Sequence, residues 1–183
     1  MILLRHGQSE FNLHFTATRR DPGIVDARLT EYGHQQAEDA ARRLAREKIT
    51  RIIASPYTRA LQTAEPLARI LGLRVRVQPV VRERYGFACD IGTPRARLTE
   101  IWPHCDFDAF EDVWWPDAYE PVASVTHRAR TFREAMTDDA DRAQTVVVTH
   151  WGFILCATGQ SVQNGETIHC DPTGPLPEQS IWR

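Results

Sequence analysis

The sequence predicts an α/β protein, a three-layer α/β/α sandwich with a largely parallel central sheet and a small inserted subdomain. Short apolar runs alternate along the chain with segments whose apolar residues have helical spacing, and this alternation favours parallel strands covered by helices. The chain has 183 residues, 42% hydrophobic and 25% charged, which is enough to bury one core. We therefore expect a single domain over residues 1–183, with residues 84–120 as a variable lid or insertion.

The first fifty residues predict a strand, a loop and a helix. Residues 2–4 are an apolar run that we expect to form a buried strand. Residues 11–28 show no regular spacing of apolar side chains and are expected to form a long loop. Residues 30–47 carry apolar residues at helical spacing and follow the plausible N-cap Thr30, so they predict a helix.

A strand, a helix and a second strand are expected next. Residues 51–55 read RIIAS and predict a short apolar strand. Ser55 and Pro56 offer an N-cap and a first-turn proline for a helix that runs to about Leu71. Residues 74–78 are rich in β-branched side chains and predict a third strand.

The second half of the chain carries fewer clear signals. Its long central stretch contains one strong helical pattern, at about 121–137. Residues 145–150 read TVVVTH and predict a buried strand. A short helix from Gly152 and a last strand over 166–170 complete the expected elements.

The composition argues against several classes of protein. A net charge of −2 and a pI near 6.4 give no basic field for nucleic acid or for an anionic membrane. The four cysteines lie far apart and form no C-x-x-C pair, so neither a zinc site nor a disulfide framework is indicated. The start of the chain does not resemble a secretory signal and no apolar run is long enough for a membrane span, so we expect a cytoplasmic protein.

Three expected strand ends carry cationic side chains or imidazoles. They are LLRHG at 3–7, ASPYTRALQTA at 54–64 and VVTHWG at 147–152. Ligands of open α/β sheets bind beyond the carboxyl ends of the strands, so these segments should meet at one edge. The assembled site would contain Arg5, His6, Arg59 and His150, a set suited to a dianion such as a phosphate group.

The residue types indicate phosphoryl transfer. A neutral imidazole can act as an in-line nucleophile while arginines hold the equatorial oxygens, which makes His6 the candidate nucleophile. Its second ring nitrogen would then donate to a backbone carbonyl. The leaving alcohol needs a proton, and Glu83, just after the third strand, is the candidate acid, with Asp90 or Glu100 next.

These motifs together resemble the histidine phosphatase superfamily, also called phosphoglycerate mutase-like. RHGQSEFN is similar to the family's R-H-G-x-[ST]-x-x-N, SPYTRALQTA to S-x-x-x-R-[AT]-x-Q-T-A, and VVTHWG to V-[ST]-H-G-G. The resemblance covers Met1–Leu71 and Thr145–Pro172. The pieces also follow the order that they have in the family.

The resemblance implies roles for individual residues. His6 would carry the phosphoryl group, and no metal or other cofactor would be needed. Glu83 would be the acid, and His150, counted with the catalytic set, would face the phosphate. The implied phosphate-binding residues are Arg5, Arg59, Asn12 and, as a weaker candidate, Ser9.

Residues 84–120 match the family only loosely, and this is where substrate selection is expected. Mutases of the family carry a longer insertion with several basic residues, whereas the insertion here, residues 102–121, is short, acidic and aromatic. We therefore expect a phosphoric monoester hydrolase of the histidine acid phosphatase type, with a phosphoglycerate-type phosphomutase as the alternative. The substrate would be a phosphorylated small molecule or a phosphoprotein. Trp151 departs from the family's second glycine and should change the wall near His150.

Three other interpretations compete. Cys89 to Arg95 match the C-x-x-G-x-x-R pattern of cysteine-dependent phosphatases, and residues 115–117 read WPD, but no buried strand precedes the cysteine and the two motifs come in the reverse order. Asp106 and Asp108 match the D-x-D core of magnesium-dependent phosphatases that use an aspartyl nucleophile, but no apolar strand precedes them. A binding module that has lost its activity is the non-enzyme alternative.

Two further groups of residues stay open at this point. Trp102, Trp114 and Trp115 could form an apolar lid over the site or pack the insertion onto the sheet. Arg19 and Arg20 could bind a second anionic group of the substrate or be an exposed basic pair.

Overall fold

A single sheet organises the protein, which we describe from a computed structural model over residues 1–107 and 110–177. The sheet of the described residues has the strand order β4-β3-β2-β5-β1-β6. All neighbouring strands are parallel except β6, which is antiparallel to β1. The strands are β1 (Ile2–Arg5), β2 (Arg51–Ala54), β3 (Val75–Val77), β4 (Cys105–Phe107), β5 (Thr145–Thr149) and β6 (Thr167–His169).

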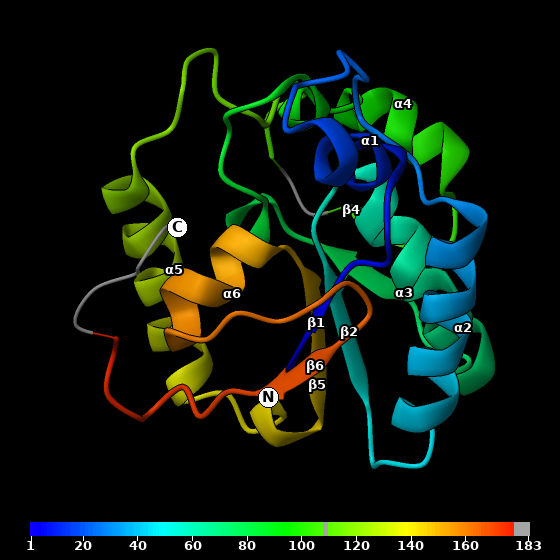
Figure 1. The fold of residues 1–183 in the computed structure, drawn as a ribbon. Helices are drawn as coiled ribbons and strands as arrows, with labels where there is room; N and C mark the ends of the chain where they lie inside the picture. The colour runs from blue at the N-terminus through cyan, green and yellow to red at the C-terminus, as the bar shows by residue number, and fades with distance from the viewer. Residues whose placement is uncertain (108–109, 178–183) are drawn as a thin grey trace.

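Helices cover both faces of the sheet, as Figure 1 shows. One face carries α2 and α3 and the other carries α5 and α6, while α1 and α4 lie at the top of this view, beyond the sheet. These layers and the largely parallel sheet confirm the predicted fold class. The helices are α1 (Glu10–Thr18), α2 (Glu31–Leu44), α3 (Thr58–Leu71), α4 (Arg95–Ile101), α5 (Val122–Thr137) and α6 (Trp151–Thr158), with 3₁₀ turns at Pro79–Val81, Ala88–Asp90 and Arg142–Gln144.

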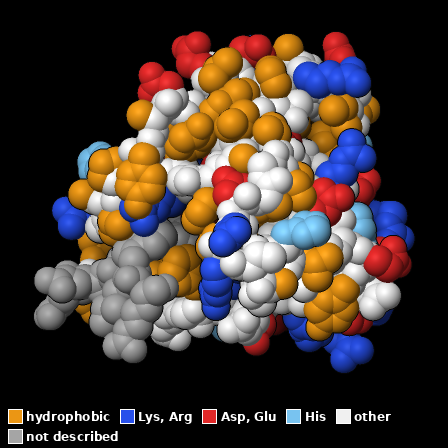
Figure 2. Space-filling view, turned by 45° about the horizontal axis from the view of Figure 1, so that its top comes forward, with side chains coloured by type: hydrophobic (Ala, Val, Ile, Leu, Met, Phe, Trp, Pro, Cys, Tyr) orange, Lys and Arg blue, Asp and Glu red, His pale blue; other side chains and the backbone are white. Residues whose placement is uncertain are grey.

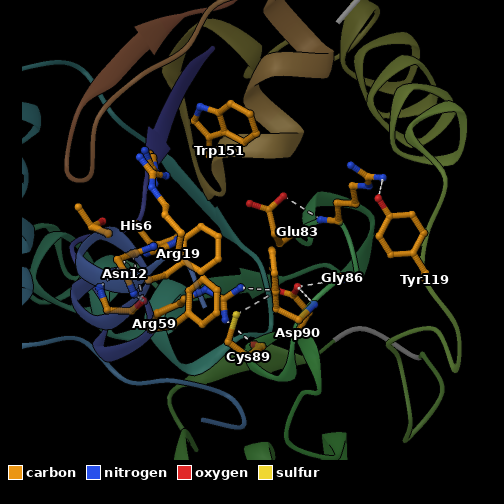
Figure 3. Close-up of a pocket in the computed structure, with 17 residues that line it drawn as sticks. His6, Asn12, Arg19, Arg59, Glu83, Gly86, Cys89, Asp90, Tyr119 and Trp151 are labelled. Atoms are coloured by element: carbon orange, nitrogen blue, oxygen red, sulfur yellow. Dashed lines mark hydrogen bonds and ion pairs between the residues drawn. The ribbon is translucent and has the colours of Figure 1, made fainter. Parts of the chain in front are cut away.

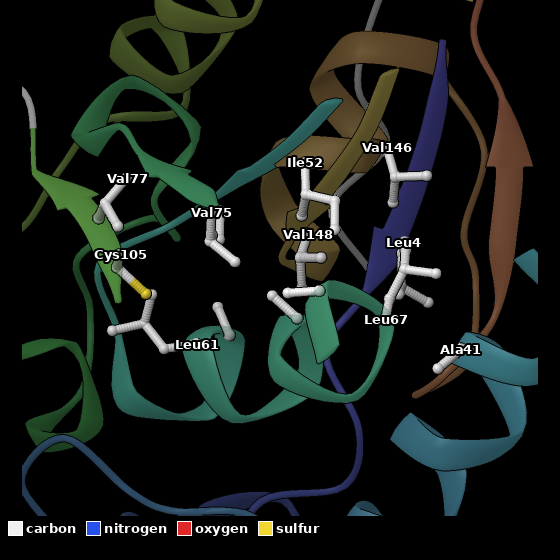
Figure 4. Packing of buried hydrophobic residues seen from close by; sticks show 14 of the residues in the cluster. Leu4, Ala41, Ile52, Leu61, Leu67, Val75, Val77, Cys105, Val146 and Val148 are labelled. Carbon is white, nitrogen blue, oxygen red and sulfur yellow. The ribbon is translucent and has the colours of Figure 1, made fainter. Parts of the chain in front are cut away.

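The core is divided in two because successive strand residues point to opposite faces of the sheet. In β5, Val146 and Val148 pack against α2 and α3, as Figure 4 shows, whereas Val147 packs against α5 and α6. All three valines are fully buried. Burial on both faces explains why the central strands are continuous apolar runs rather than alternating ones. No helix of the described residues is long and apolar enough to cross a membrane.

The prediction of a loop over residues 11–28 is wrong, because α1 occupies its first half. Ser9 and Asn12 form a reciprocal capping box at the start of this helix. Only Phe11 of the helix is buried, so no apolar stripe of helical spacing was present in the sequence to indicate it. The cap was the signal that could have located α1.

The start of α3 also differs from the prediction. The helix begins at Thr58, and Tyr57 is its N-cap residue without a side-chain cap. The Ser55 hydroxyl is fully buried and forms a hydrogen bond with His150 instead. The prediction of Ser55 as the N-cap of this helix is therefore wrong, although the residue does lie just before it.

Residues 84–120 contribute to the sheet. They contain α4 and β4, and β4 pairs in parallel with β3 at the edge. Neither element was expected from the sequence. Trp102 and Trp114 are buried against the sheet and Trp115 packs on the same cluster, so these tryptophans pack the segment rather than cover the site. The single-domain assignment, which extends into residues outside the described ranges, stays a prediction.

Candidate active site

Three strand ends bring the predicted residues together. His6 directly follows β1, His150 directly follows β5, and Arg59 lies in the first turn of α3, after β2. The rings of His6 and His150 are in contact, with centroids 5.0 Å apart. A pocket of about 530 Å³ opens over this edge of the sheet and is lined by Arg5, His6, Arg59, Glu83 and others (Figure 3).

Glycine allows the chain to turn closely after His6. A Cβ atom at Gly7 would clash with the carbonyl of Gly33, at the start of α2. The Gly7 amide donates to Thr63 Oγ1 at 3.1 Å, which fixes the loop against α3. This close packing holds the His6 side chain at the base of the pocket.

His6 is arranged as a nucleophile. Its Nδ1 lies 2.7 Å from the Gly7 carbonyl oxygen, an acceptor only, so Nδ1 carries the proton and donates it. Burial, followed by the positive charges of Arg59 and Arg5, holds the pKa of His6 well below its usual value. The ring is therefore neutral near pH 7, and its Nε2 carries a lone pair.

Two guanidinium groups supply positive charge beside His6. Arg5 donates to the Val162 carbonyl at 2.7 Å and lines the pocket. Arg59 is 3% exposed and donates to the Cys89 carbonyl at 2.7 Å and to Asp90 Oδ1 at 3.1 Å. These bonds to fixed backbone and carboxylate acceptors hold both side chains in place before any ligand binds.

Glu83 reaches the pocket from the segment after β3. Its two carboxyl oxygens accept from the Arg84 amide at 2.8 Å and from the Gly152 amide at 3.2 Å. Burial, and then the negative charge of Asp90, raise the pKa of Glu83. In Figure 3 Glu83 lies between Trp151 and Asp90, across the pocket from His6. A carboxyl group with a raised pKa in this position can hold a proton for a leaving group.

His150 is fully buried next to His6. Its Nε2 lies 2.8 Å from Ser55 Oγ, and its Nδ1 has no hydrogen-bond partner among the described residues. Burial and the charge of Arg59 hold the pKa of His150 well below its usual value, so the ring is neutral. If the Ser55 hydroxyl donates to Nε2, then Nδ1 carries the ring proton and is the atom that can donate to a bound anion.

Asn12 and Ser9 line the pocket but also hold α1 in place. Asn12 Oδ1 accepts from the Ser9 amide at 3.1 Å and from Asn164 Nδ2 at 3.2 Å. The carboxamide is thereby oriented, and its NH₂ group is the end left for a ligand. The Ser9 hydroxyl also points to Asn12 Oδ1, at 3.0 Å, which favours a structural role for the serine.

Several residues of the site were not found by sequence reasoning. Asp90 was considered only as a substitute acid, yet it is the ion-pair partner of Arg59. Ser55 was assigned to a helix cap, yet it contacts His150. Glu100, the other substitute acid, is exposed on α4 and pairs with Arg97. A single charged residue in the otherwise uncharged stretch 86–94 was the signal for Asp90, and the sequence offered none for Ser55.

Arg19 and Arg20, the basic pair after α1, differ in their position relative to the pocket. Arg19 lines the pocket, with its guanidinium carbon 5.9 Å from the centroid of the Phe15 ring. Arg20 is exposed and does not line the pocket. Of the two, Arg19 is therefore the one placed to meet a second group of the substrate.

The rival motifs do not form their expected sites. Cys89 is buried and burial raises the pKa of its thiol, the opposite of what a nucleophilic thiolate requires. Neither Arg95 nor residues 115–117 line the pocket. Asp106 pairs with Arg74 on the edge strand, and Asp108 lies outside the described residues. Among the residues with described positions, no group of three His, Cys, Asp or Glu side chains could hold a metal ion.

Comparison with known proteins agrees with this geometry. The model of the histidine phosphatase superfamily, branch 1, matches residues 1–174. A phosphoglycerate mutase-like protein of Arabidopsis thaliana is 31% identical over 160 residues, which are 84% of this chain and 67% of that protein. A glucosyl-3-phosphoglycerate phosphatase of Mycobacterium tuberculosis is 30% identical over 164 residues, 84% of this chain and 71% of the relative. A probable phosphoglycerate mutase, GpmB, of Photorhabdus laumondii is 43% identical over 83 residues, but these are only 45% of this chain and 37% of that protein.

Solved structures share the fold. One named mycobacterial hydrolase 1 aligns with a TM-score of 0.64 and 28% identity over 91% of this chain and 86% of the other. A mycobacterial glucosyl-3-phosphoglycerate phosphatase in complex with VO3 aligns with a TM-score of 0.62 and 25% identity, covering 91% of this chain and 88% of the other. The motifs, the site and the family model agree, and the chain belongs to branch 1 of the histidine phosphatase superfamily.

Proposed function

We propose that this protein is a phosphomonoesterase of the histidine acid phosphatase type, which needs no metal ion and transfers the phosphoryl group first to His6 and then to water. One observation carries the proposal: His6, whose Nδ1 is hydrogen-bonded to the Gly7 carbonyl, lines a pocket that also contains the guanidinium groups of Arg5 and Arg59. Those groups can neutralise the equatorial oxygens without a metal ion. The family assignment supports a reaction through phosphohistidine.

The proposed reaction has two steps. In the first, His6 Nε2 attacks phosphorus, the bond from phosphorus to the ester oxygen breaks, and Glu83 gives its proton to the departing oxygen. In the second, a water molecule loses a proton to the Glu83 carboxylate and attacks phosphorus. The P–N bond then breaks, and phosphate leaves with the His6 lone pair restored.

His150 and the arginines would act on the phosphoryl group in both steps. Arg5 and Arg59 are charged and pre-oriented, so their bonds to the oxygens can strengthen as charge accumulates. His150 Nδ1, which is buried without a partner among the described residues, would donate to a third oxygen. Asn12 is a further polar contact in this scheme.

Hydrolysis is favoured over mutase chemistry by the walls of the pocket. A mutase must hold a bisphosphorylated intermediate at both ends, which needs a second strong anion site. Among the described residues that line the pocket, the cations besides Arg5 and Arg59 are Arg19 and Arg84. Arg84 already donates to Tyr119 and to the Glu120 carbonyl. The remaining wall is largely aromatic. The phosphoglycerate-type mutase therefore remains the second candidate, supported by relatives that carry that name.

The substrate and location belong to the same proposal. The substrate would be a phosphorylated small molecule or a phosphoprotein, and the protein would act on it in the cytoplasm. A net charge of −2 favours neither nucleic acid nor an anionic membrane as a partner.

The test is turnover of an aryl phosphate by three preparations. His6→Ala should abolish turnover, Cys89→Ser should keep most of it, and a chelator should leave the wild-type rate unchanged. Rapid acid-free quenching with labelled substrate should trap an alkali-stable, acid-labile phosphohistidine in the wild type and none in His6→Ala. Activity in His6→Ala that is lost in Cys89→Ser would refute the proposal. Interconversion of 3-phosphoglycerate faster than phosphate release, with a bisphosphorylated primer, would favour the mutase.

A further inference from the structure

Three phenylalanine rings form one wall of the pocket. Phe11 and Phe15 lie on α1, and Phe87 directly precedes the 3₁₀ turn Ala88–Asp90. The Phe11 and Phe15 rings are stacked, with centroids 5.1 Å apart and an interplanar angle of 16°. Phe87 contacts both, at 5.2 Å from Phe11 and 5.1 Å from Phe15. All three rings line the same pocket as His6 and Arg59.

This wall is separate from the two cores that stabilise the sheet. Phe11 belongs to a small buried cluster with Ala27 and Cys89, and Phe15 packs against that cluster. Phe15 is only partly buried, and Phe87 is 43% exposed. A contiguous apolar surface that lines a pocket is typical of a ligand-binding site. Figure 2 shows hydrophobic side chains gathered at the end of the molecule where α1 and α4 lie in Figure 1.

A further aromatic side chain stands near the acid. Trp151, the first residue of α6, lines the pocket, and its indole N–H donates to Ser161 Oγ at 2.8 Å. This hydrogen bond fixes the orientation of the ring. In Figure 3 Trp151 lies beside Glu83, the group that would protonate the leaving oxygen. The leaving group would therefore depart into a space bordered by Trp151 and by the phenylalanine rings.

We propose that the substrate is a small phosphomonoester whose leaving group carries an apolar ring, held by Phe15 and Phe87. This inference rests on the proposed phosphatase function and specifies its substrate class. A ring placed between His6 and Arg59 on one side and Phe15 and Phe87 on the other removes apolar surface from water on both the substrate and the protein. A pocket of about 530 Å³ has the size of small-molecule sites.

The experiment compares benzyl phosphate with ethyl phosphate. Both are esters of primary alcohols, so their leaving groups differ mainly in the ring and little in intrinsic reactivity. We expect kcat/KM for benzyl phosphate to exceed that for ethyl phosphate by about tenfold or more in the wild type. Phe15→Ala and Phe87→Ala should each reduce this ratio several-fold by lowering the benzyl value while leaving the ethyl value nearly unchanged.

Leu13→Ala is the matched control. Leu13 lies on the same helix as Phe15, is 51% exposed and does not line the pocket, so its variant should keep the wild-type ratio. A wild-type ratio near one, or an equal loss on both esters in the phenylalanine variants, would overturn the inference while the proposed phosphatase function stands. Failure to hydrolyse either ester, with no phosphohistidine formed, would count against the proposed function itself. Faster turnover of a phosphotyrosyl peptide than of free O-phosphotyrosine would overturn the small-molecule assignment.

Discussion

Arg59 and Asp90 form a buried ion pair at the base of the pocket, with Arg59 Nη2 3.1 Å from Asp90 Oδ1 and side chains that are 3% and 2% exposed. The second Asp90 oxygen accepts from the amides of Gly86 and Phe87, each at 3.1 Å. The aspartate therefore connects Arg59 to the loop that carries Phe87. A buried pair of this kind is costly to break from one side, because the remaining charge is left without a partner.

Asp90→Asn should change the pH dependence of catalysis. The charge of Asp90 adds to burial in raising the pKa of Glu83, so removing that charge should lower the pKa of the acid. The alkaline limb of the kcat/KM profile, measured with a poor leaving group, should then move to lower pH. Glu100→Gln, at an exposed position on α4, is the matched control and should leave the profile unchanged. An unshifted alkaline limb in Asp90→Asn would separate this aspartate from the acid.

Glu83→Gln should slow the release of poor leaving groups. An alkoxide departs slowly without a proton, and loss of a positioned acid costs about 10²–10⁴-fold in rate. A leaving group as good as dinitrophenolate needs no proton, so its release should be affected little. The measurement is a plot of rate against leaving-group pKa for the two proteins. Parallel lines, meaning an equal loss on every ester, would remove Glu83 from the acid role.

The gathering of His6, Arg59 and His150 at one edge of the sheet could be predicted because these residues lie next to strong secondary-structure signals. His6 and His150 directly follow apolar strands, and the carboxyl ends of parallel strands meet at one edge by geometry alone. The carbonyl partner of His6 was also predicted, and the Gly7 carbonyl confirms it. The roles of the predicted site residues in catalysis stay predictions.

The missed features depend on tertiary contacts. The strand β4 has three residues and gains its stability from pairing with β3, so its own sequence carries little signal. The aromatic wall joins Phe15 to Phe87 across more than seventy positions of sequence, and nothing local links them. The tryptophans of the insertion were equally ambiguous, because an apolar ring can cover a site or fill a core.

Ser55→Ala should weaken binding of phosphate. The serine hydroxyl lies 2.8 Å from His150 Nε2 and leaves Nδ1 as the ring nitrogen without a hydrogen-bond partner among the described residues. Loss of one buried hydrogen bond costs about 1–1.5 kcal/mol, close to a tenfold change in affinity. We therefore expect the inhibition constant of inorganic phosphate to rise by about tenfold. Ser124→Ala, which removes a hydroxyl bonded to Glu120 outside the pocket, should leave that constant unchanged. Unaltered phosphate inhibition in Ser55→Ala would show that His150 needs no partner to be positioned.

The two buried histidines should make the protein less stable in mild acid. Burial is the largest cause of the depressed pKa of both His6 and His150 in the folded state, whereas in the unfolded chain each would titrate near 6.5. Below that pH the unfolded state therefore binds more protons than the folded state. The contribution of the two histidines to the free energy of unfolding has its full value above about pH 6.5 and falls as the pH drops. Each histidine contributes a slope of up to about 1.4 kcal/mol per pH unit.

Urea unfolding between pH 7.5 and 5.5 measures this slope. The double variant His6→Gln, His150→Gln should show a flatter dependence than the wild type, whatever its absolute stability, because the two groups that take up protons on unfolding are gone. His34→Gln, at an exposed position on α2, should keep the wild-type slope. If the double variant and the wild type lose stability in parallel, the imidazoles are protonated in the folded protein as readily as in the unfolded chain. His6 would then be cationic in mild acid, and its Nε2 could not attack phosphorus there.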